Sequence, residues 1–260
     1  MSHAQMICAH RGASYDAPEN TIVAFTRAFE QGADAIEGDF YLSKDGRIAC
    51  FHDGELKRTA KQPGRICDYT CAELKRFDVG AWKAAEFRGE RIPTLEEVIE
   101  VIPSGKKFFI ELKTGPEIVG PLAEILERAE DRLRPEQIVL IAFDKATCVE
   151  CKKRLPRLKT HWLVGAKMEK DPNSGSPKIV PTAESIARTV MQLGVDGVGL
   201  GVGRETRFGR ITAGLQEAGV EFHLWTLDDP DVAEYFLQYQ PIGITTNRPA
   251  FMREKLPKLN

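Results

Sequence analysis

The sequence has few cysteines, no long apolar run and no excess of basic charge. Six cysteines are scattered over 260 residues, which is too sparse for a disulfide scaffold. No apolar run approaches the ~20 residues of a membrane span, and no secretory signal is recognisable at the N-terminus. Basic and acidic side chains number 36 and 38, so no charge excess favours a nucleic-acid partner. We therefore expect a cytoplasmic protein with no transmembrane segment and no nucleic-acid partner.

Some residues that could ligate a metal are interpreted as packing residues. Cys148 and Cys151 have the spacing of zinc ligands, but they lie in a segment that reads as an amphipathic helix. Buried thiols are therefore favoured, with a zinc site as the alternative. His161 and His223 fall inside apolar strand candidates, and we also expect them to pack in the core.

Short apolar runs alternate with helical segments along the whole chain. The strand candidates are rich in Ile, Val, Leu and Phe and lie at 6–10, 34–40, 107–112, 138–143, 160–165, 195–201, 220–226 and 241–246. The helix candidates lie at 21–31, 94–101, 116–128, 144–154, 182–193, 206–218, 230–238 and 248–255. Asn20 is expected to cap the first helix. The alternation predicts the α/β class and a TIM (β/α)8 barrel, with a doubly wound sheet as the alternative.

The chain length suits one such barrel, which typically has ~250 residues. One segment, residues 54–91, carries charges and glycines with little regular period. We interpret it as a small insertion after the second strand, so that residues 1–260 form a single domain. The sequence SGSP at 174–177 predicts a loop.

Three carboxylates lie on otherwise apolar strand candidates, near the strand ends where TIM-barrel active sites form. Glu37 and Asp39 are two residues apart and therefore share one face of their strand, and Glu111 lies on the next barrel strand. Burying three carboxylates is costly unless their charge is compensated. Oxygen ligands favour a hard divalent cation, Mg²⁺, Ca²⁺ or Mn²⁺. The alternative is a salt network with Arg11 and Lys113.

Histidines and cations end neighbouring predicted strands. His10 and His52 are candidates for proton transfer, because imidazole titrates near neutral pH. Arg11 and Lys113 suggest an anionic ligand, since guanidinium binds phosphate bidentately and ammonium acts as a point charge. Two histidines beside carboxylates and cations favour catalysis over a structural role. Trp225 ends the seventh predicted strand.

Eight motifs follow one another from about residue 6 to about residue 250. They read HRGAS, APENT, IEGDFYLSKDG, FHDGELKRT, GERIPTLEEV, IELK, LWTLDDP and GITTNRP. In this order they resemble the glycerophosphodiester phosphodiesterase family, in its bacterial cytosolic type. The resemblance implies a TIM barrel with a small insertion after the second strand. It also implies a metal-dependent phosphoric diester hydrolase of lipid and glycerol metabolism, which converts a small-molecule glycerophosphodiester into glycerol 3-phosphate and an alcohol.

The resemblance implies a role for each of the residues singled out. They are the metal ligands Glu37, Asp39 and Glu111, the acid/base pair His10 and His52, the phosphate-binding Arg11 and Lys113, and Trp225 in the apolar wall. Two positions depart from the family pattern. Gly38 stands where a hydrophobic residue is common and Asn247 where Asp is frequent. We expect Gly38 to have little chemical effect and Asn247 to affect only the start of a helix.

Several alternatives stay open from the sequence. Either histidine could be the base, and the nucleophile could be water or the 2-hydroxyl of the substrate, which would give a cyclic phosphate. A related barrel phosphodiesterase for lysophospholipids or phosphoinositols is one competing reading. A catalytically silent, phosphodiester-binding barrel is another. The sequence predicts neither the leaving alcohol nor the oligomeric state.

Overall fold

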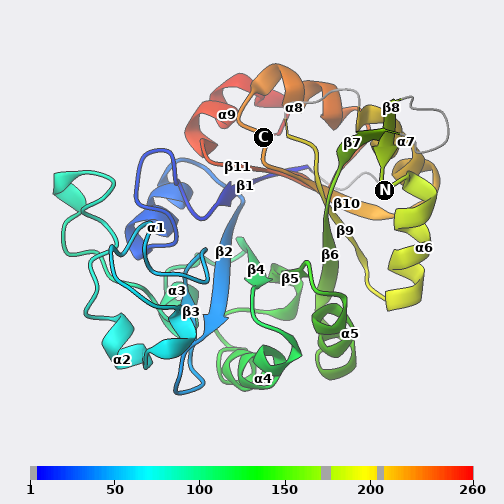
Figure 1. Cartoon of the computed structure of the whole chain (residues 1–260). Coiled ribbons are helices and arrows are strands. Elements are labelled where there is room, and N and C mark those ends of the chain that lie inside the picture. Colours follow the sequence, from blue (N-terminus) through cyan, green and yellow to red (C-terminus); the bar gives the residue numbers. More distant parts are fainter. Residues whose placement is uncertain (1–4, 171–176, 204–207, 260) are drawn as a thin grey trace.

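The computed structural model describes residues 5–170, 177–203 and 208–259, and within them parallel strands close into a barrel (Figure 1). The barrel strands are β1 (Met6–His10), β2 (Ala35–Leu42), β4 (Lys107–Leu112), β5 (Ile138–Ala142), β6 (Lys159–Gly165), β9 (Gly197–Gly201), β10 (Glu221–Trp225) and β11 (Gly243–Thr246). Their order is β1-β11-β10-β9-β6-β5-β4-β2, and the β1–β2 pairing closes the ring. The TIM barrel prediction is confirmed. The doubly wound alternative is wrong because β1 and β2 would not pair with each other in an open sheet.

Helices surround the strands of the barrel (Figure 1). They are α1 (Ile22–Glu30), α3 (Leu95–Glu100), α4 (Val119–Arg128), α5 (Lys145–Arg154), α6 (Ala183–Leu193), α7 (Gly209–Glu217), α8 (Pro230–Leu237) and α9 (Pro249–Lys255). Short 3₁₀ turns occur at η3 (Pro116–Ile118), η4 (Pro135–Gln137) and η6 (Pro257–Leu259). None of the helices in the described ranges is long and apolar enough to cross a membrane.

The first helix begins one residue later than predicted. Thr21 is its N-cap, and the hydroxyl of Thr21 accepts a hydrogen bond from the backbone N–H of Ala24 at 3.3 Å. The predicted cap, Asn20, is therefore wrong. Its side-chain amide instead donates to Asp39 Oδ2 at 2.8 Å. This polar residue supports the site rather than the helix.

The hydrophobic core has two parts. One is a layer of buried side chains between the strands and the helices, and the other is a smaller cluster inside the barrel. The interior cluster consists of buried side chains from consecutive barrel strands: Cys8, Ala35, Phe109, Val139, Ile141 and Leu163. The thiols of Cys148 and Cys151 lie on the buried face of α5, as predicted, and burial raises the pKa of each to about 12. Protonated thiols of this kind behave as small apolar side chains.

The segment that follows β2 folds back on the outside of the barrel. The strand β3 (Ile48–Cys50) pairs antiparallel with β2. Beyond it the chain forms η1 (Ile66–Asp68), α2 (Cys71–Leu74) and η2 (Ala85–Phe87), drawn in cyan to teal in Figure 1. These turns bury an apolar cluster of their own, which includes Leu56 and Ile66. We interpret residues 54–91 as an insertion in a single domain.

A small hairpin between β6 and α6 was not predicted. The strands β7 (Lys167–Lys170) and β8 (Pro177–Val180) pair antiparallel, with Lys167 opposite Val180. The first of them reads KMEK and lacks the apolar content that a strand prediction requires. The loop predicted at 174–177 lies outside the described residues, except for Pro177, which begins β8.

Candidate active site

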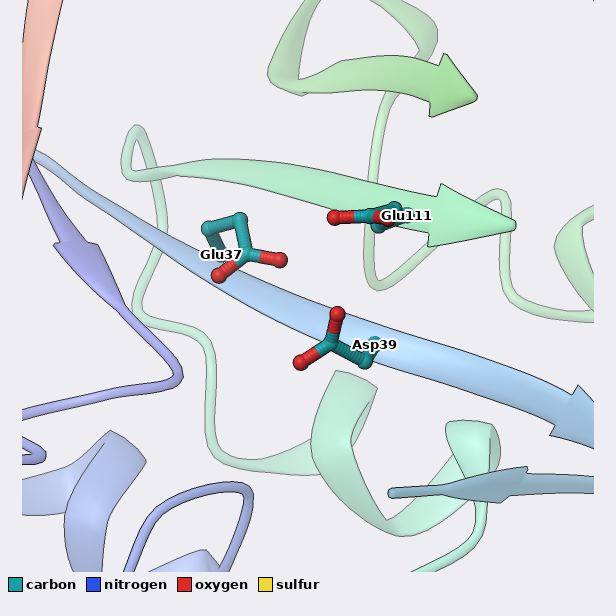
Figure 2. Close-up of side chains that lie close together, drawn as sticks. All are labelled: Glu37, Asp39 and Glu111. Atoms are coloured by element: carbon teal, nitrogen blue, oxygen red, sulfur yellow. The ribbon is translucent and has the colours of Figure 1, made fainter. Parts of the chain in front are cut away.

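Three carboxylates from two neighbouring strands meet inside the barrel. Glu37 and Asp39 project from β2, and Glu111 projects from β4, where it is in register with Asp39 (Figure 2). One oxygen from each lies within 4.8 Å of the others. The three residues are only 3%, 1% and 8% exposed, respectively. Gly38, between the two β2 carboxylates, faces away from the cluster toward the ring of Phe25.

The carboxylate of Asp39 is contacted by two cations and by the side-chain amide of Asn20. Lys113 Nζ lies 3.3 Å from Asp39 Oδ1 and 2.7 Å from Glu111 Oε1. Arg11 Nε lies 3.3 Å from Asp39 Oδ2. Burial raises the pKa of Asp39, but the charges of Lys113 and Arg11 more than offset it, so the pKa lies below its ordinary value. Asp39 is therefore the ionised member of the cluster.

The other two carboxylates are less well compensated. Burial and the charge of Asp39 raise the pKa of Glu37 well above its ordinary value, and they raise the pKa of Glu111 to about 7. Glu37 Oε1 is buried and has no hydrogen-bond partner among the described residues. The salt network considered as an alternative is thus present but incomplete. Three oxygen donors, one of them unpaired, fit a hard divalent cation.

The end of β1 places His10 beside a residue far along the chain. Asn247 Oδ1 lies 2.8 Å from His10 Nδ1, while Asn247 Nδ2 donates to Asp228 Oδ2 at 2.6 Å. A flipped amide would set two oxygens against each other at Asp228, so the orientation of Asn247 is fixed. Asn247 Oδ1 can only accept, so Nδ1 of His10 carries the proton and Nε2 is the free base.

The expectation that Asn247 affects only a helix start is therefore wrong. Its amide holds the ring of a predicted catalytic histidine, and Ser14 Oγ donates to the same Oδ1 at 2.8 Å. Burial and the nearby charge of Arg11 lower the pKa of His10 to about 4. The imidazole is consequently neutral at pH 7.

The second histidine is held by a carboxylate rather than an amide. His52 Nδ1 lies 2.7 Å from Asp53 Oδ1, and Arg58 Nε donates to the other oxygen of Asp53 at 2.6 Å. The carboxylate accepts, so His52 also carries its proton on Nδ1 and presents Nε2 to a ligand. Burial lowers the pKa of His52 below its ordinary value, and the charge of Asp39 and the hydrogen bond to Asp53 offset that effect only in part.

One cavity of ≈160 Å³ collects nearly all of the predicted site residues. Its wall includes seven of the eight: His10, Arg11, Glu37, His52, Glu111, Lys113 and Trp225. Asp39 bonds to two of these from beneath. The apolar side carries Trp225 edge-to-face with Phe143, their ring centroids 5.6 Å apart. Phe143 was not among the predicted site residues, although its place directly after β5 was a signal for it.

The chain is similar to known proteins along almost its entire length. A model of the "Glycerophosphoryl diester phosphodiesterase family" matches residues 10–251. A glycerophosphodiester phosphodiesterase of Caldanaerobacter subterraneus is 32% identical over 248 residues, which are 94% of each chain. A phosphodiesterase of Oleispira antarctica, solved in complex with the product sn-glycerol-3-phosphate, has a TM-score of 0.82 and 27% identity, covering 98% of this chain and 97% of its own. A glycerophosphodiester phosphodiesterase of Agrobacterium tumefaciens has a TM-score of 0.78 at 22% identity, covering 96% and 99%, and supports the fold alone.

Proposed function

The chain belongs to the glycerophosphoryl diester phosphodiesterase family and is a phosphoric diester hydrolase, and from this premise we propose that it hydrolyses glycerophosphodiesters to glycerol 3-phosphate and an alcohol. The observation that carries the proposal is the convergence of three buried carboxylates, two cations and two histidines around one cavity. The product complex of the Oleispira phosphodiesterase supports the same choice of product. A silent binding barrel would not require this set of ionisable groups.

We propose that Glu37, Asp39 and Glu111 hold one divalent cation, Mg²⁺ or Ca²⁺, with Mn²⁺ also suited to the oxygen donors. The unpaired Glu37 Oε1 supports this assignment. When bound, the cation would supply Lewis-acid polarisation of the phosphoryl oxygens and a template for the glycerol hydroxyls.

Arg11 and Lys113 are the residues proposed to bind the phosphate. Both line the cavity and both already lie against Asp39, so their charges are directed to one point. Preorganised cations of this kind stabilise the negative charge that develops on the phosphoryl group in the transition state. Trp225 is proposed to line the apolar wall of the same cavity, beside Phe143.

The hydrogen bonds of the histidines suggest which one removes a proton. His10 is neutral with a free Nε2, so we assign it as the base that takes a proton from the nucleophile, water or the substrate's 2-hydroxyl. Burial lowers the pKa of His52 as well, but the carboxylate of Asp53 accepts from Nδ1 and partly stabilises an imidazolium that carries a second proton on Nε2, so we assign His52 as the acid. The nucleophile–phosphorus bond forms, the phosphorus–leaving-oxygen bond breaks, and the leaving oxygen receives the proton from His52 Nε2. If the 2-hydroxyl is the nucleophile, the product of this step is a cyclic phosphate, and water then attacks its phosphorus and breaks the bond to the 2-oxygen, which takes up a proton to give glycerol 3-phosphate.

The test is a panel of glycerophosphodiesters assayed for glycerol 3-phosphate with Mg²⁺, Ca²⁺, Mn²⁺ or EDTA. We expect release with at least one metal and none after complete chelation. His10→Ala and His52→Ala should each lower kcat by about 10²–10⁴-fold. No glycerol 3-phosphate from any substrate would refute the function, and near-normal turnover of both variants would refute the two-histidine mechanism.

The same proposal places the enzyme in the cytoplasm, in glycerol and lipid metabolism. Lysophospholipids and phosphoinositols are the competing substrates. An acyl chain would need a surface free of charge at the mouth, whereas seven of the thirteen residues that line the cavity beside His52 are charged. This favours the water-soluble diesters.

A further inference from the structure

A larger cavity of ≈1410 Å³ adjoins the catalytic cavity and shares two of its residues, His52 and Lys113. Its outer wall is the loop after β3, which contributes Lys57, Lys61 and Arg65. We call the part of the surface formed by these three residues the basic groove. Taking the proposed function as given, we propose that the basic groove binds the leaving alcohol and selects alcohols with a negative charge, phosphorylated or carboxylated.

The charges of this surface are not balanced. Of the groups that line the cavity, Arg58 is paired with Asp53 and Glu19, and Lys113 with the metal-binding carboxylates. Lys57, Lys61 and Arg65 are exposed and have no ion pair within the described part of the chain. Glu55 is the acidic side chain that remains to oppose them. The surplus is therefore two positive charges, directly beside the cavity where the ester is cleaved.

The loop that carries these cations has a fixed shape. The backbone N–H of Leu56 donates to Gly64 O at 3.0 Å, and that of Ile66 donates to Gly54 O at 3.1 Å. Leu56 and Ile66 are fully buried in the apolar cluster of the insertion, which anchors both ends. The backbone that carries the cations is therefore fixed, so binding a ligand need not order the loop, which reduces the entropy lost on binding.

The position of the basic groove matches the departing half of the substrate. The catalytic cavity of ≈160 Å³ is smaller than the ~300–1,000 Å³ of pockets that enclose a whole drug-sized ligand. It therefore has room for the reacting half only. His52, the proposed acid, borders both cavities, so the oxygen that it protonates lies at their junction. A leaving alcohol attached to that oxygen extends toward Lys57, Lys61 and Arg65.

The experiment compares three substrates that share the glycerol 3-phosphate half. They are glycerophosphocholine, glycerophosphoglycerol and glycerophosphoinositol 4-phosphate, with cationic, neutral and anionic leaving groups. At low salt we expect kcat/KM to be about tenfold higher for the anionic substrate than for the cationic one. The preference should shrink as the ionic strength rises from about 0.02 M to about 0.5 M, because exposed charges are screened.

A triple variant tests the residues themselves. Lys57→Gln, Lys61→Gln and Arg65→Gln together should lower kcat/KM for glycerophosphoinositol 4-phosphate about tenfold and for glycerophosphoglycerol less than about twofold. The matched control is Arg128→Gln, Lys153→Gln and Lys258→Gln, which removes the same charge from residues that line neither cavity. It should leave all three rates unchanged.

Each outcome decides a separate point. No glycerol 3-phosphate from any substrate would refute the proposed function. Release with equal kcat/KM for all three head groups, or equal losses in the triple variant and its control, would refute only the basic groove. Thermal unfolding checks that the triple variant is folded. If it is not, Lys57→Gln and Lys61→Gln are measured singly, and an unchanged anionic preference in both would overturn the proposal.

Discussion

Two groups of histidines and carboxylates lie along the same barrel, and their polar atoms are satisfied differently. In the interior group, His161 Nδ1 lies 3.1 Å from His223 Nδ1, and His161 Nε2 lies 3.0 Å from Glu221 Oε1. Lys159 completes this group through Glu221. At the mouth, the histidines bond outward to other residues, and an oxygen of Glu37 is left unpaired. In the interior group these residue types satisfy one another, whereas at the mouth they leave a carboxylate oxygen that a ligand could bind.

The carboxyl groups show the difference most directly. Burial raises the pKa of Glu221, but the hydrogen bonds from His161 and Lys159 more than offset it and lower the pKa to about 2. At the mouth, burial prevails and the pKa of Glu111 rises to about 7. A carboxylate whose charge is satisfied by the protein contributes stability, whereas one that is not satisfied has a cost that a bound cation removes.

The largest effect should follow from neutralising a mouth carboxylate. Glu37→Gln keeps the shape but removes a proposed metal ligand, so we expect kcat/KM to fall by about 10³-fold or more. Stability without metal should be unchanged or higher, because repulsion with Asp39 and Glu111 is relieved. Activity and chemical unfolding in EDTA measure the two effects. Near-normal activity of Glu37→Gln would contradict the proposal that the carboxylates at the mouth bind a catalytic metal.

The next effect concerns the amide that holds His10. Asn247→Ala should lower kcat about 10–100-fold, the usual cost of losing a residue that orients a reactive group. Asn247→Asp alone would set a carboxylate oxygen against Asp228 Oδ2, so the matched variant combines Asn247→Asp with Asp228→Asn. This pair keeps an acceptor for His10 Nδ1 and brings the charge next to the ring, so it should recover most of the rate and raise the pKa of His10 from about 4.

The pH profile separates this role from a merely structural one. His10 acts unprotonated, so a higher pKa should move the acid limb of kcat/KM to higher pH, by about one pH unit in the double variant Asn247→Asp, Asp228→Asn. A profile identical to that of the unmodified protein would show that Asn247 only maintains the fold.

The sequence predicted the barrel and the residues around its cavity because both depend on local pattern. Apolar runs of strand length and helical segments alternate regularly, and side chains at positions i and i+2 share a strand face, which brings Glu37 beside Asp39. Parallel strands then place Glu111 in register with Asp39. These steps require only residue spacing and the rule that TIM-barrel sites form at the strand ends.

The parts that the sequence did not predict depend on contacts between distant side chains. Asn247 lies 237 residues from His10, and its orientation is determined by Asp228, which no local pattern connects to either. Asn20 resembles a helix cap in the sequence, but the carboxylate of Asp39 competes for its amide. The basic groove likewise requires knowing which cations are already paired.

The third effect is on stability rather than catalysis. Glu221→Gln should lower the free energy of unfolding at pH 7 by about 1–2 kcal/mol, allowing for partial exposure of the carboxylate. The pKa is lowered in the folded state, so the contribution is present above about pH 4.5 and is lost as the pH falls toward 2. Urea unfolding at several pH values should show the difference narrowing over that range. A constant difference would contradict the assignment.

The smallest effect should come from His223, which belongs to the interior group yet also lines the catalytic cavity. His223→Phe keeps a planar ring but leaves His161 Nδ1 without its partner, which should cost about 1 kcal/mol of stability. If only the residues at the mouth take part in catalysis, kcat/KM should change by less than about threefold. Removing a proton-transfer residue would lower the rate by about 10²-fold or more. His52→Ala is the matched control, with the opposite result of lost activity and retained stability. A loss of kcat in His223→Phe comparable to that in His52→Ala would contradict this expectation. It would mean that His223, on β10, belongs to the catalytic group and not only to the interior group.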